Sequence, residues 1–366
     1  MVEERYLKVR IGDLPLDSGE TLPGVELACS VTGRLRPDGS NLVVVCHALT
    51  GSHHLWGPSV EGLPEGWWNG VVGPGMAIDT DRFCVVCFNN LCSPYGSTAP
   101  SSLGPEGRPW GMRFPLVSCR DVARSQVMGL RALGVERALA VVGGSMGGMV
   151  ALEMALSFPK VFERCVVIAA PMRLYPQAIA YNEVQRQAIM WDPDWREGDY
   201  YPDPGPVRGL ATARMLAMIT YRSENSFVSR WMREVAHGDP WRWDGKFQVE
   251  TYLHHHGQEL VKRFDANCYL YLTRAMDLHD VLAGRGGSPE EAFGGFSGRD
   301  ILGVGISSDM LFPNWQVEEV VSSAKRAGVN GWYEEIESPN GHDAFLIDLD
   351  QVDDILRTFW RRTGMG

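Results

Sequence analysis

The sequence predicts an α/β protein whose mostly parallel sheet is interrupted by a helical insertion. Short apolar runs rich in β-branched residues, such as LVVVC (42–46), alternate with helical patterns, as in a sheet that is covered on both faces. Such runs stop over 172–290, where helical patterns follow one another, and resume with ILGVGIS (301–307). We therefore expect a core formed by 1–171 and 291–366. The insertion should lie over the carboxyl ends of the strands, where ligands bind in open α/β sheets.

The composition indicates a globular protein and argues against several classes of partner. The chain has 366 residues, of which 45% are hydrophobic and 22% charged, as expected for a protein with a large core. A net charge of −11 without a basic block argues against nucleic-acid binding. No apolar run approaches the roughly 18 residues of a membrane helix, and the charged N-terminal stretch lacks the apolar segment of a signal peptide. We expect a cytoplasmic protein without nucleic-acid or membrane partners.

The cysteine and histidine patterns do not predict a metal site. Several of the eight cysteines lie in apolar runs, as small core residues do. Cys84 and Cys87 match a C-x-x-C pattern, but the alternation of a strand sends their thiols to opposite faces. His254, His255 and His256 are consecutive, so on a helix they do not converge on one ion. We expect them on a polar helix surface.

The first ninety residues alternate between strand and loop patterns. Residues 5–11 and 25–31 predict two short edge strands joined by a turn rich in Pro and Gly. The run 42–46 predicts a buried strand, 53–82 a long ordered loop, and 82–90 another buried strand. We therefore expect the sheet to begin with these strands.

Helices and strands then alternate to the end of the core. Ser118 or Asp121 is expected to cap a helix that runs through Leu133 and ends at Gly134. Beyond these residues, the patterns predict strands over 163–170, 301–307 and 331–338, a helix over 314–327 and a terminal helix through 353–362. Strands that alternate with helices at this spacing favour a parallel sheet.

Residues 138–157 (ALAVVGGSMGGMVALEMALS) contain the pattern around which we expect an active site to form. A short apolar run leads into a glycine-rich turn with Ser145 at its apex, and a helical pattern follows. Strand, tight turn with a serine, and helix together are the nucleophile elbow of an α/β-hydrolase fold. The sharp turn exposes the serine Oγ to a base, and the flanking glycines relieve the crowding of the backbone. A phosphate-binding or packing glycine turn is the alternative interpretation.

Two backbone donors are expected to stabilise an oxyanion beside this serine. The N–H of Met146 follows Ser145 at the predicted helix N-terminus and is the natural first donor. In this fold the loop after the strand 42–46 supplies the second, for which Leu49 is the candidate. A plain exit from strand to loop is the simpler interpretation of that segment.

The nucleophile needs a histidine base and an acid that orients it, in the chain order serine, acid, histidine. Of the histidines after Ser145, only His342 lies outside the insertion. Asp309 lies at the carboxyl end of the strand before it, so acid and base follow successive strands. His342 would take the Ser145 proton while Asp309 holds the ring in the correct tautomer. A turn-capping aspartate and a surface histidine are the alternatives, and Asp343 is the rival acid.

Several further blocks carry a resemblance to a known family. HALTGS, YGSTAPSS, GGSMGGMVALE, YNEVQRQAI, ARMLAMITYRS, RFDANCYLYLTRAMD and GHDAFL together resemble the homoserine O-acetyltransferases, which are α/β-hydrolase-fold acyltransferases of methionine synthesis. The resemblance runs from about Leu42 to Leu349. It implies a ping-pong reaction without a further cofactor: acetyl-CoA, the co-substrate, acylates Ser145, and the hydroxyl of L-homoserine then takes the acetyl group.

The resemblance also implies residues that bind the acceptor. The family's catalytic positions fall on the serine, aspartate and histidine named above, and its acceptor-binding positions fall on Arg214, Tyr221 and Asp343. A planar guanidinium suits an amino-acid carboxylate, and a carboxylate beside the catalytic histidine suits an ammonium group. Arg214 by itself fits a helix surface as well, but Tyr221 follows two turns later on the same face.

The resemblance implies a homodimer that pairs through the helical lid, and it leaves the substrates open. The loop NNLCSPYGSTAPSS differs from the glycine-rich form of many bacterial members and looks more like that of fungal relatives. Succinyl-CoA as donor and L-serine as acceptor are therefore alternatives. A hydrolase with the same three catalytic residues and a non-catalytic binding protein are the other functional readings. No phosphate-binding loop identifies the contacts of CoA.

Overall fold

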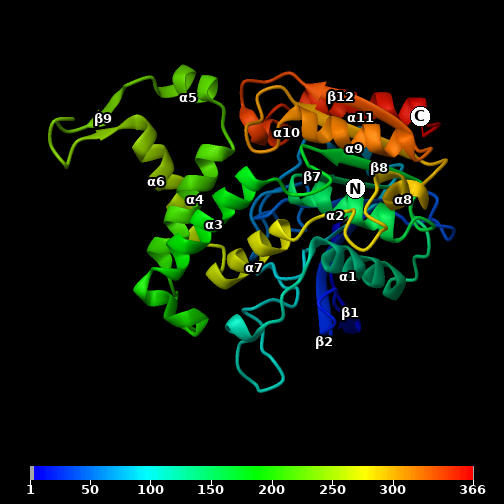
Figure 1. The fold of residues 1–366 in the computed structure, drawn as a ribbon, viewed down its shortest axis with the longest axis horizontal. Helices are drawn as coiled ribbons and strands as arrows, with labels where there is room; N and C mark the ends of the chain where they lie inside the picture. The colour runs from blue at the N-terminus through cyan, green and yellow to red at the C-terminus, as the bar shows by residue number, and fades with distance from the viewer. Residues whose placement is uncertain (1–3, 366) are drawn as a thin grey trace.

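The computed structural model describes residues 4–365 and has an eight-stranded sheet at its centre (Figure 1). The strand order is β1-β2-β6-β3-β7-β8-β11-β12. The bounds of these strands, in chain order, are β1 Glu4–Pro15, β2 Thr21–Thr32, β3 Leu42–Cys46, β6 Cys84–Phe88, β7 Ala140–Gly144, β8 Arg164–Ile168, β11 Asp300–Ile306 and β12 Asn330–Ile336.

The sheet is mostly parallel, as the alternating pattern predicts. All neighbours from β6 to β12 pair in parallel, whereas β1 and β2 pair antiparallel with each other and β2 pairs antiparallel with β6. The expectation of two short edge strands is wrong in two respects. Both strands are longer than predicted, and only β1 lies at the edge. Strand β2 pairs with both β1 and β6, so it is an interior strand, and the residues of its second half are buried.

Helices cover both faces of the sheet. Helices α1 (Cys119–Ala132), α2 (Met146–Ser157) and α9 (Asn314–Arg326) contribute to one hydrophobic cluster. Helix α11 (Leu349–Arg362) and the loop 53–82 contribute to a second cluster on the opposite face. That loop is ordered, as predicted, and holds two short strands, β4 (Val72–Gly73) and β5 (Ile78–Asp79).

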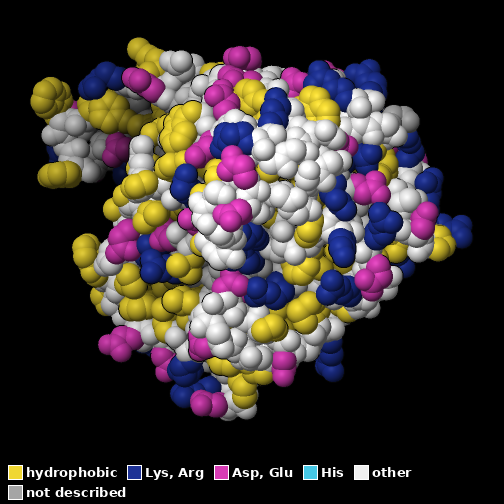
Figure 2. Space-filling view, turned by 45° about the vertical axis from the view of Figure 1, so that its right-hand side comes forward, with side chains coloured by type: hydrophobic (Ala, Val, Ile, Leu, Met, Phe, Trp, Pro, Cys, Tyr) yellow, Lys and Arg dark blue, Asp and Glu magenta, His cyan; other side chains and the backbone are white. Residues whose placement is uncertain are grey.

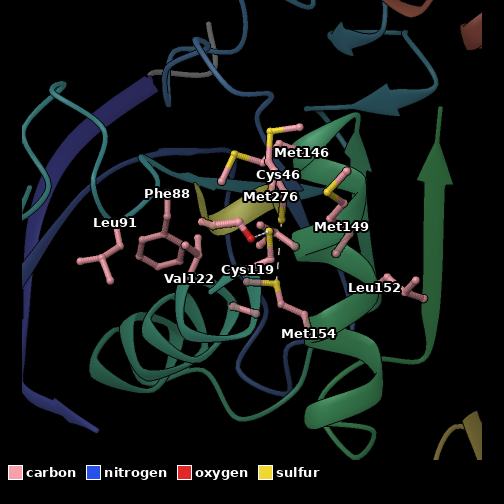
Figure 3. Packing of buried hydrophobic residues seen from close by; sticks show 14 of the residues in the cluster. Cys46, Phe88, Leu91, Cys119, Val122, Met146, Met149, Leu152, Met154 and Met276 are labelled. Carbon is pink, nitrogen blue, oxygen red and sulfur yellow. Dashed lines mark hydrogen bonds between the residues drawn. The ribbon is translucent and has the colours of Figure 1, made fainter. Parts of the chain in front are cut away.

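Sulfur-containing side chains pack under α2, the helix that follows Ser145. Figure 3 shows Met146, Met149 and Met154 of this helix beside Cys46 and Cys119. Eleven of the twelve residues of α2 are buried, so the helix is enclosed by protein on every side. A helix held in this way gives its N-terminal residue a fixed position.

Helix α1 begins where the sequence predicts. The Ser118 side chain accepts a hydrogen bond from the Asp121 N–H, and the Asp121 carboxylate accepts one from the Ser118 N–H. This reciprocal arrangement is a capping box, so both predicted capping residues take part. Gly134 follows the end of the helix with a φ of +80°, a conformation that favours glycine.

The insertion is helical, apart from one hairpin that the sequence did not predict. Its helices are α3 Pro176–Met190, α4 Val207–Thr220, α5 Glu224–Trp231, α6 Gln248–Val261, α7 Ala266–Asp277 and α8 Pro289–Gly294. Between α5 and α6, the short strands β9 (Val235–His237) and β10 (Lys246–Phe247) form an arm that projects from the body in Figure 1. The division of the chain at residues 172 and 290 stays a prediction.

The cysteines and histidines mostly lie where they were expected. Cys84 and Cys87 belong to different hydrophobic clusters, on opposite faces of the sheet. His254 and His255 are exposed, but His256 is half-buried, with its ring centroid 4.4 Å from that of Tyr252. A polar surface is therefore the wrong interpretation for His256, because α6 turns this side chain toward its neighbours. Within residues 4–365 no three metal-ligating side chains cluster, and no helix is long and apolar enough to cross a membrane.

Candidate active site

Ser145 lies on a tight turn between β7 and α2. Its backbone angles are φ 57° and ψ −128°, an unusual conformation for a residue with a side chain. The turn needs glycines because a Cβ at Gly143 would lie 2.1 Å from the Gly147 carbonyl oxygen. A Cβ at Gly147 would lie 2.1 Å from the Cys46 carbonyl oxygen on β3. The sequence pattern around Ser145 thus produces a turn that presses against the neighbouring strand and lifts the serine above it.

The three predicted catalytic side chains lie together at the carboxyl ends of the strands. Nε2 of His342 is 2.8 Å from Ser145 Oγ, and Nδ1 of His342 is 2.6 Å from an Asp309 carboxylate oxygen. The other Asp309 oxygen accepts hydrogen bonds from the N–H groups of Leu311 and Phe312, at 2.8 and 2.9 Å. Asp309 is therefore fixed by its own turn and is the acid on the histidine ring.

The surroundings of His342 favour its charged form. Burial alone would lower its pKa, but the charge of Asp309, the hydrogen bond to it and the charge of Asp343 raise the pKa above the usual 6.5. The ring can accept the Ser145 proton, and the resulting imidazolium is stabilised by two carboxylates. This is the arrangement that a general base of an acyl-transfer reaction requires.

Both predicted oxyanion donors are free to act. Among residues 4–365, neither the Leu49 N–H nor the Met146 N–H donates to another protein group. Leu49 lines the same cavity as Ser145, and Met146 is the first residue of α2, where the helix dipole is positive. Two unpaired donors beside a serine nucleophile are the usual form of an oxyanion hole.

His47, at the end of β3, supports the loop that carries Leu49 and was not singled out from the sequence. Its Nε2 accepts a hydrogen bond from the Asn90 N–H at 3.0 Å, and Nδ1 lies 2.8 Å from the Ala48 carbonyl. Burial lowers its pKa to about 4, so the ring is neutral at pH 7. The sequence shows only that His47 lies at the end of a strand. Its role depends on the contact with Asn90, which follows β6 and is some forty residues away.

The catalytic serine opens onto a cavity of about 280 Å³ between the core and the insertion. The predicted acceptor-binding residues Arg214, Tyr221 and Asp343 all line it. The guanidinium carbon of Arg214 is 5.5 Å from the centre of the Tyr221 ring, as expected for residues on one helix face. Arg214 forms no ion pair or side-chain hydrogen bond with the other described residues, so its guanidinium is available to an anionic ligand.

Asp343 is close to three groups that carry or can carry a positive charge. Burial raises its pKa, while Arg222, His342 and Arg214 act in the opposite direction; the net pKa is above the usual value. The nearest guanidinium nitrogen of Arg222 is 3.7 Å from the Asp343 carboxylate. A carboxylate in this position can pair with an ammonium group of a ligand, in partial competition with Arg222.

Two arginines of the site were missed by the sequence analysis. Arg222 is buried, and its Nε donates to the Tyr252 hydroxyl at 3.3 Å. Arg263 lines the cavity and donates to the Thr50 carbonyl at 2.8 Å and to the Tyr95 hydroxyl. Each comes shortly after a helical pattern, where surface arginines are also common. No local signal in the sequence therefore distinguishes them from surface residues.

The loop that carries His342 is attached to the insertion. The N–H of Asp343 donates to the Tyr221 carbonyl at 3.2 Å, and the Ser223 hydroxyl donates to the Pro339 carbonyl. A Cβ at Gly341 would lie 2.7 Å from backbone atoms of Arg222 and Ser223, so only glycine permits this approach. The segment that carries Tyr221 is therefore held in a defined position relative to His342.

Comparisons with known proteins agree with this geometry. A family model described as the alpha/beta hydrolase fold matches residues 41–349. The chain is 49% identical to a homoserine O-acetyltransferase of Symbiobacterium thermophilum, over 98% of this chain and 95% of that protein. It is 46% identical to a homoserine O-acetyltransferase of Moorella thermoacetica, over 94% of this chain and 93% of that protein.

Solved structures with the same architecture include a transferase and an esterase. The crystal structure of homoserine O-acetyltransferase from Bacillus anthracis superimposes with a TM-score of 0.91 at 28% identity, covering 98% of both chains. The crystal structure of esterase E22 superimposes with a TM-score of 0.87 at 26% identity, covering 98% of this chain and 100% of that one. Transfer and hydrolysis are thus both found on this architecture.

Proposed function

The chain belongs to the homoserine O-acetyltransferase family of α/β-hydrolase-fold acyltransferases, and on that premise we propose that it transfers an acetyl group from acetyl-CoA to the hydroxyl of L-homoserine. One observation carries the proposal. Ser145 and His342, which is hydrogen-bonded to Asp309, line a small cavity together with the unpaired guanidinium of Arg214. Nucleophile and acceptor site therefore lie within reach of each other.

In the first half-reaction, His342 Nε2 takes the proton of Ser145 as the serine Oγ attacks the thioester carbonyl of acetyl-CoA. The N–H groups of Leu49 and Met146 stabilise the negative charge on the carbonyl oxygen. The carbon–sulfur bond then breaks, His342 returns the proton to the leaving sulfur, and CoA departs as a thiol. Acetyl-Ser145 remains.

In the second half-reaction, the homoserine hydroxyl takes the place of the thiol. Arg214 binds its carboxylate with two parallel hydrogen bonds, and Asp343 pairs with its ammonium group. His342 removes the hydroxyl proton as the oxygen attacks acetyl-Ser145. The ester bond to the serine breaks, Ser145 recovers the proton from His342, and O-acetyl-L-homoserine is released.

Steady-state kinetics test this proposal directly. Acetyl-, propionyl- and succinyl-CoA are crossed with L-homoserine and L-serine, and CoA release is measured with and without acceptor. We expect acetyl-CoA with homoserine to give the highest kcat/KM and parallel lines in double-reciprocal plots. Equal rates of CoA release with and without homoserine would instead favour hydrolysis, the activity named for the similar esterase structure.

The acyl-enzyme can be detected without an acceptor. Rapid quenching after mixing with acetyl-CoA alone should leave an acetyl group on the peptide that contains Ser145. The Ser145→Ala variant should carry none. Absence of the modification in the wild-type protein would contradict the two-step mechanism.

We also propose that a second copy of the chain covers the lid. Figure 2 shows hydrophobic side chains on the projecting arm, and large apolar residues are exposed across the insertion. They are Val184, Trp191, Val207, Ile219, Val228, Met232, Val235, Trp241, Trp243 and Leu278. Trp241 and Trp243 are almost fully exposed on a two-stranded hairpin, which is marginal when it stands alone.

Light scattering tests the dimer. The wild-type protein should have twice the mass of the chain, and a Trp241→Ser/Trp243→Ser variant should shift toward the monomer on dilution. Trp315→Ser is the matched control, because it removes a half-exposed tryptophan from α9, which lies outside the insertion. This variant should stay dimeric on dilution. A monomeric wild-type protein at all concentrations would contradict the proposal. A cytoplasmic location and a place in methionine synthesis stay predictions.

A further inference from the structure

We infer that Arg263, in the turn after α6, is a positioning residue for the oxyanion hole and acts on the Leu49 N–H through two peptide groups. The inference rests on the proposed function, in which that N–H is an oxyanion donor. The Arg263 guanidinium donates to the Thr50 carbonyl at 2.8 Å and to the Tyr95 hydroxyl. A lid residue therefore binds the core loop one residue beyond the proposed donor.

The turn after β3 connects this contact to Leu49. The Gly51 N–H donates to the Ala48 carbonyl at 3.0 Å. A trans peptide group is planar, and its C=O and N–H point in opposite directions. The Thr50 carbonyl and the Gly51 N–H belong to one such group. The Ala48 carbonyl and the Leu49 N–H belong to a second, so two peptide groups in series join Arg263 to the oxyanion donor.

The direction of this series strengthens the Leu49 donor. Hydrogen bonds in a chain polarise one another, so a bond to a carbonyl oxygen makes the N–H of the same peptide group a better donor. A cation at the start of the chain makes the first bond charge-assisted. Arg263 forms no ion pair with the other described residues, and burial raises the pKa of Tyr95, so its hydroxyl partner is neutral. No carboxylate in contact therefore cancels the charge of Arg263.

His47 fixes the second peptide group from the core side. Its Nε2 accepts a hydrogen bond from the Asn90 N–H, so the neutral ring holds its proton on Nδ1 and donates it to the Ala48 carbonyl at 2.8 Å. The Gln126 side-chain amide in turn donates to the Asn90 side-chain oxygen at 2.9 Å. The Ala48 carbonyl accepts two hydrogen bonds, of which only one depends on the lid. Loss of the arginine should therefore weaken the donor without releasing the loop.

A role of this kind predicts a distinctive pattern of kinetic effects. Each tetrahedral intermediate places its oxyanion in the same hole, whichever donor or acceptor takes part. Arg263 should therefore affect acylation and deacylation alike, whereas Arg214 should affect only the homoserine step. Both arginines line the catalytic cavity, so a direct contact of Arg263 with one substrate is the competing interpretation. Such a contact would change the kinetics of that substrate alone.

Acylation by two unrelated donors tests the pattern. The release of CoA from acetyl-CoA and of p-nitrophenolate from p-nitrophenyl acetate is measured before the first turnover is complete. We expect Arg263→Met to slow both about 10- to 50-fold, less than the loss of a direct oxyanion donor. Arg263→Lys keeps the charge and a donor for the Thr50 carbonyl, and should recover most of the rate. Arg208→Met, at an exposed position of α4, is the control and should stay within about twofold of wild type.

Three further measurements distinguish positioning from a general structural defect. Deacylation of acetyl-Ser145 by homoserine and by water should slow by similar factors in Arg263→Met. The affinity for CoA, titrated into Ser145→Ala with and without Arg263→Met, should change by less than about twofold, because the donor acts in the transition state. The infrared stretching band of the acetyl-Ser145 carbonyl should move to higher wavenumber in Arg263→Met and return toward its wild-type position in Arg263→Lys.

The ester donor separates this inference from the proposed function, since neither CoA nor homoserine takes part in its reaction. If the wild-type protein fails to acetylate homoserine but Arg263→Met slows acylation by p-nitrophenyl acetate, the acceptor is wrong and the positioning role stands. A loss confined to acetyl-CoA or to homoserine overturns the positioning role. So does an unmoved carbonyl band, or a wild-type protein that neither donor acylates.

Discussion

The two halves of the catalytic cavity are built in different ways. On the core side, Ser145, Asp309 and His342 each follow a strand of one parallel sheet, whose hydrogen-bonded ladder fixes their separation. On the lid side, Arg214 comes from α4 and Arg263 from the turn after α6, and the place of both depends on side-chain packing. The core half supplies chemistry that hydrolases and transferases share. In the proposed function the lid half selects the nucleophile that receives the acyl group, so substitutions in the two halves should fail in different ways.

Asp309→Asn should have the largest effect, because it acts on the shared chemistry. An amide at this position stabilises the wrong tautomer of His342, so we expect kcat/KM to fall about 10⁴-fold for acylation with any donor. Stopped-flow measurement of CoA release checks this. Asp350→Asn, on the exposed face of α11, is the control for the change from acid to amide. A fall of less than tenfold in kcat/KM would contradict the proposed role of Asp309.

Arg214→Met should affect only the acceptor half. Loss of a charge-assisted pair with the homoserine carboxylate is expected to lower kcat/KM for homoserine about 10- to 100-fold. Acylation of Ser145 by acetyl-CoA should change by less than twofold. Arg208→Met makes the same substitution at an exposed position of α4 and should leave both steps intact. An equal fall in the rates of both steps would contradict the assignment of Arg214 to the acceptor step alone.

The pH profile of acylation links the two halves. His342 must be neutral to accept the serine proton, and its pKa is raised above 6.5, so the rate should fall tenfold per pH unit below that raised value. Asp343 contributes to this rise. In Asp343→Asn the acidic limb should therefore move to lower pH, which a pH series of CoA release measures. A limb that stays in place would show that Asp343 acts on the acceptor alone.

Ser223→Ala should have the smallest effect. It removes the N-terminal cap of α5 and the hydrogen bond from the lid to the Pro339 carbonyl. We expect a loss of about 1 kcal/mol in the free energy of unfolding and only a small rise in the KM for homoserine. Urea unfolding measures the first quantity. Ser322→Ala, on the exposed face of α9, should stay within about 0.5 kcal/mol of wild type.

Local patterns predicted most elements of the core and the helical character of the insertion, and the misses depend on distant partners or on very short strands. The strand, turn and helix around Ser145, and the capping of α1 by Ser118, were predictable because their signals lie within a few residues. The interior position of β2 was missed, since it depends on β6, a partner more than fifty residues away. The hairpin of β9 and β10 was missed because each strand is only two or three residues long.

The sequence by itself predicted that Ser145, His342 and Asp309 lie together as nucleophile, base and acid, because parallel strands bring their carboxyl ends to one edge and chain order then assigns the roles. It also carried the resemblance that pointed to Arg214. Only the tertiary structure decided that Arg222 faces Asp343 and that Arg263 donates to the loop that follows Leu49. These features depend on how helices distant in the sequence pack against core loops, and no local pattern encodes that packing.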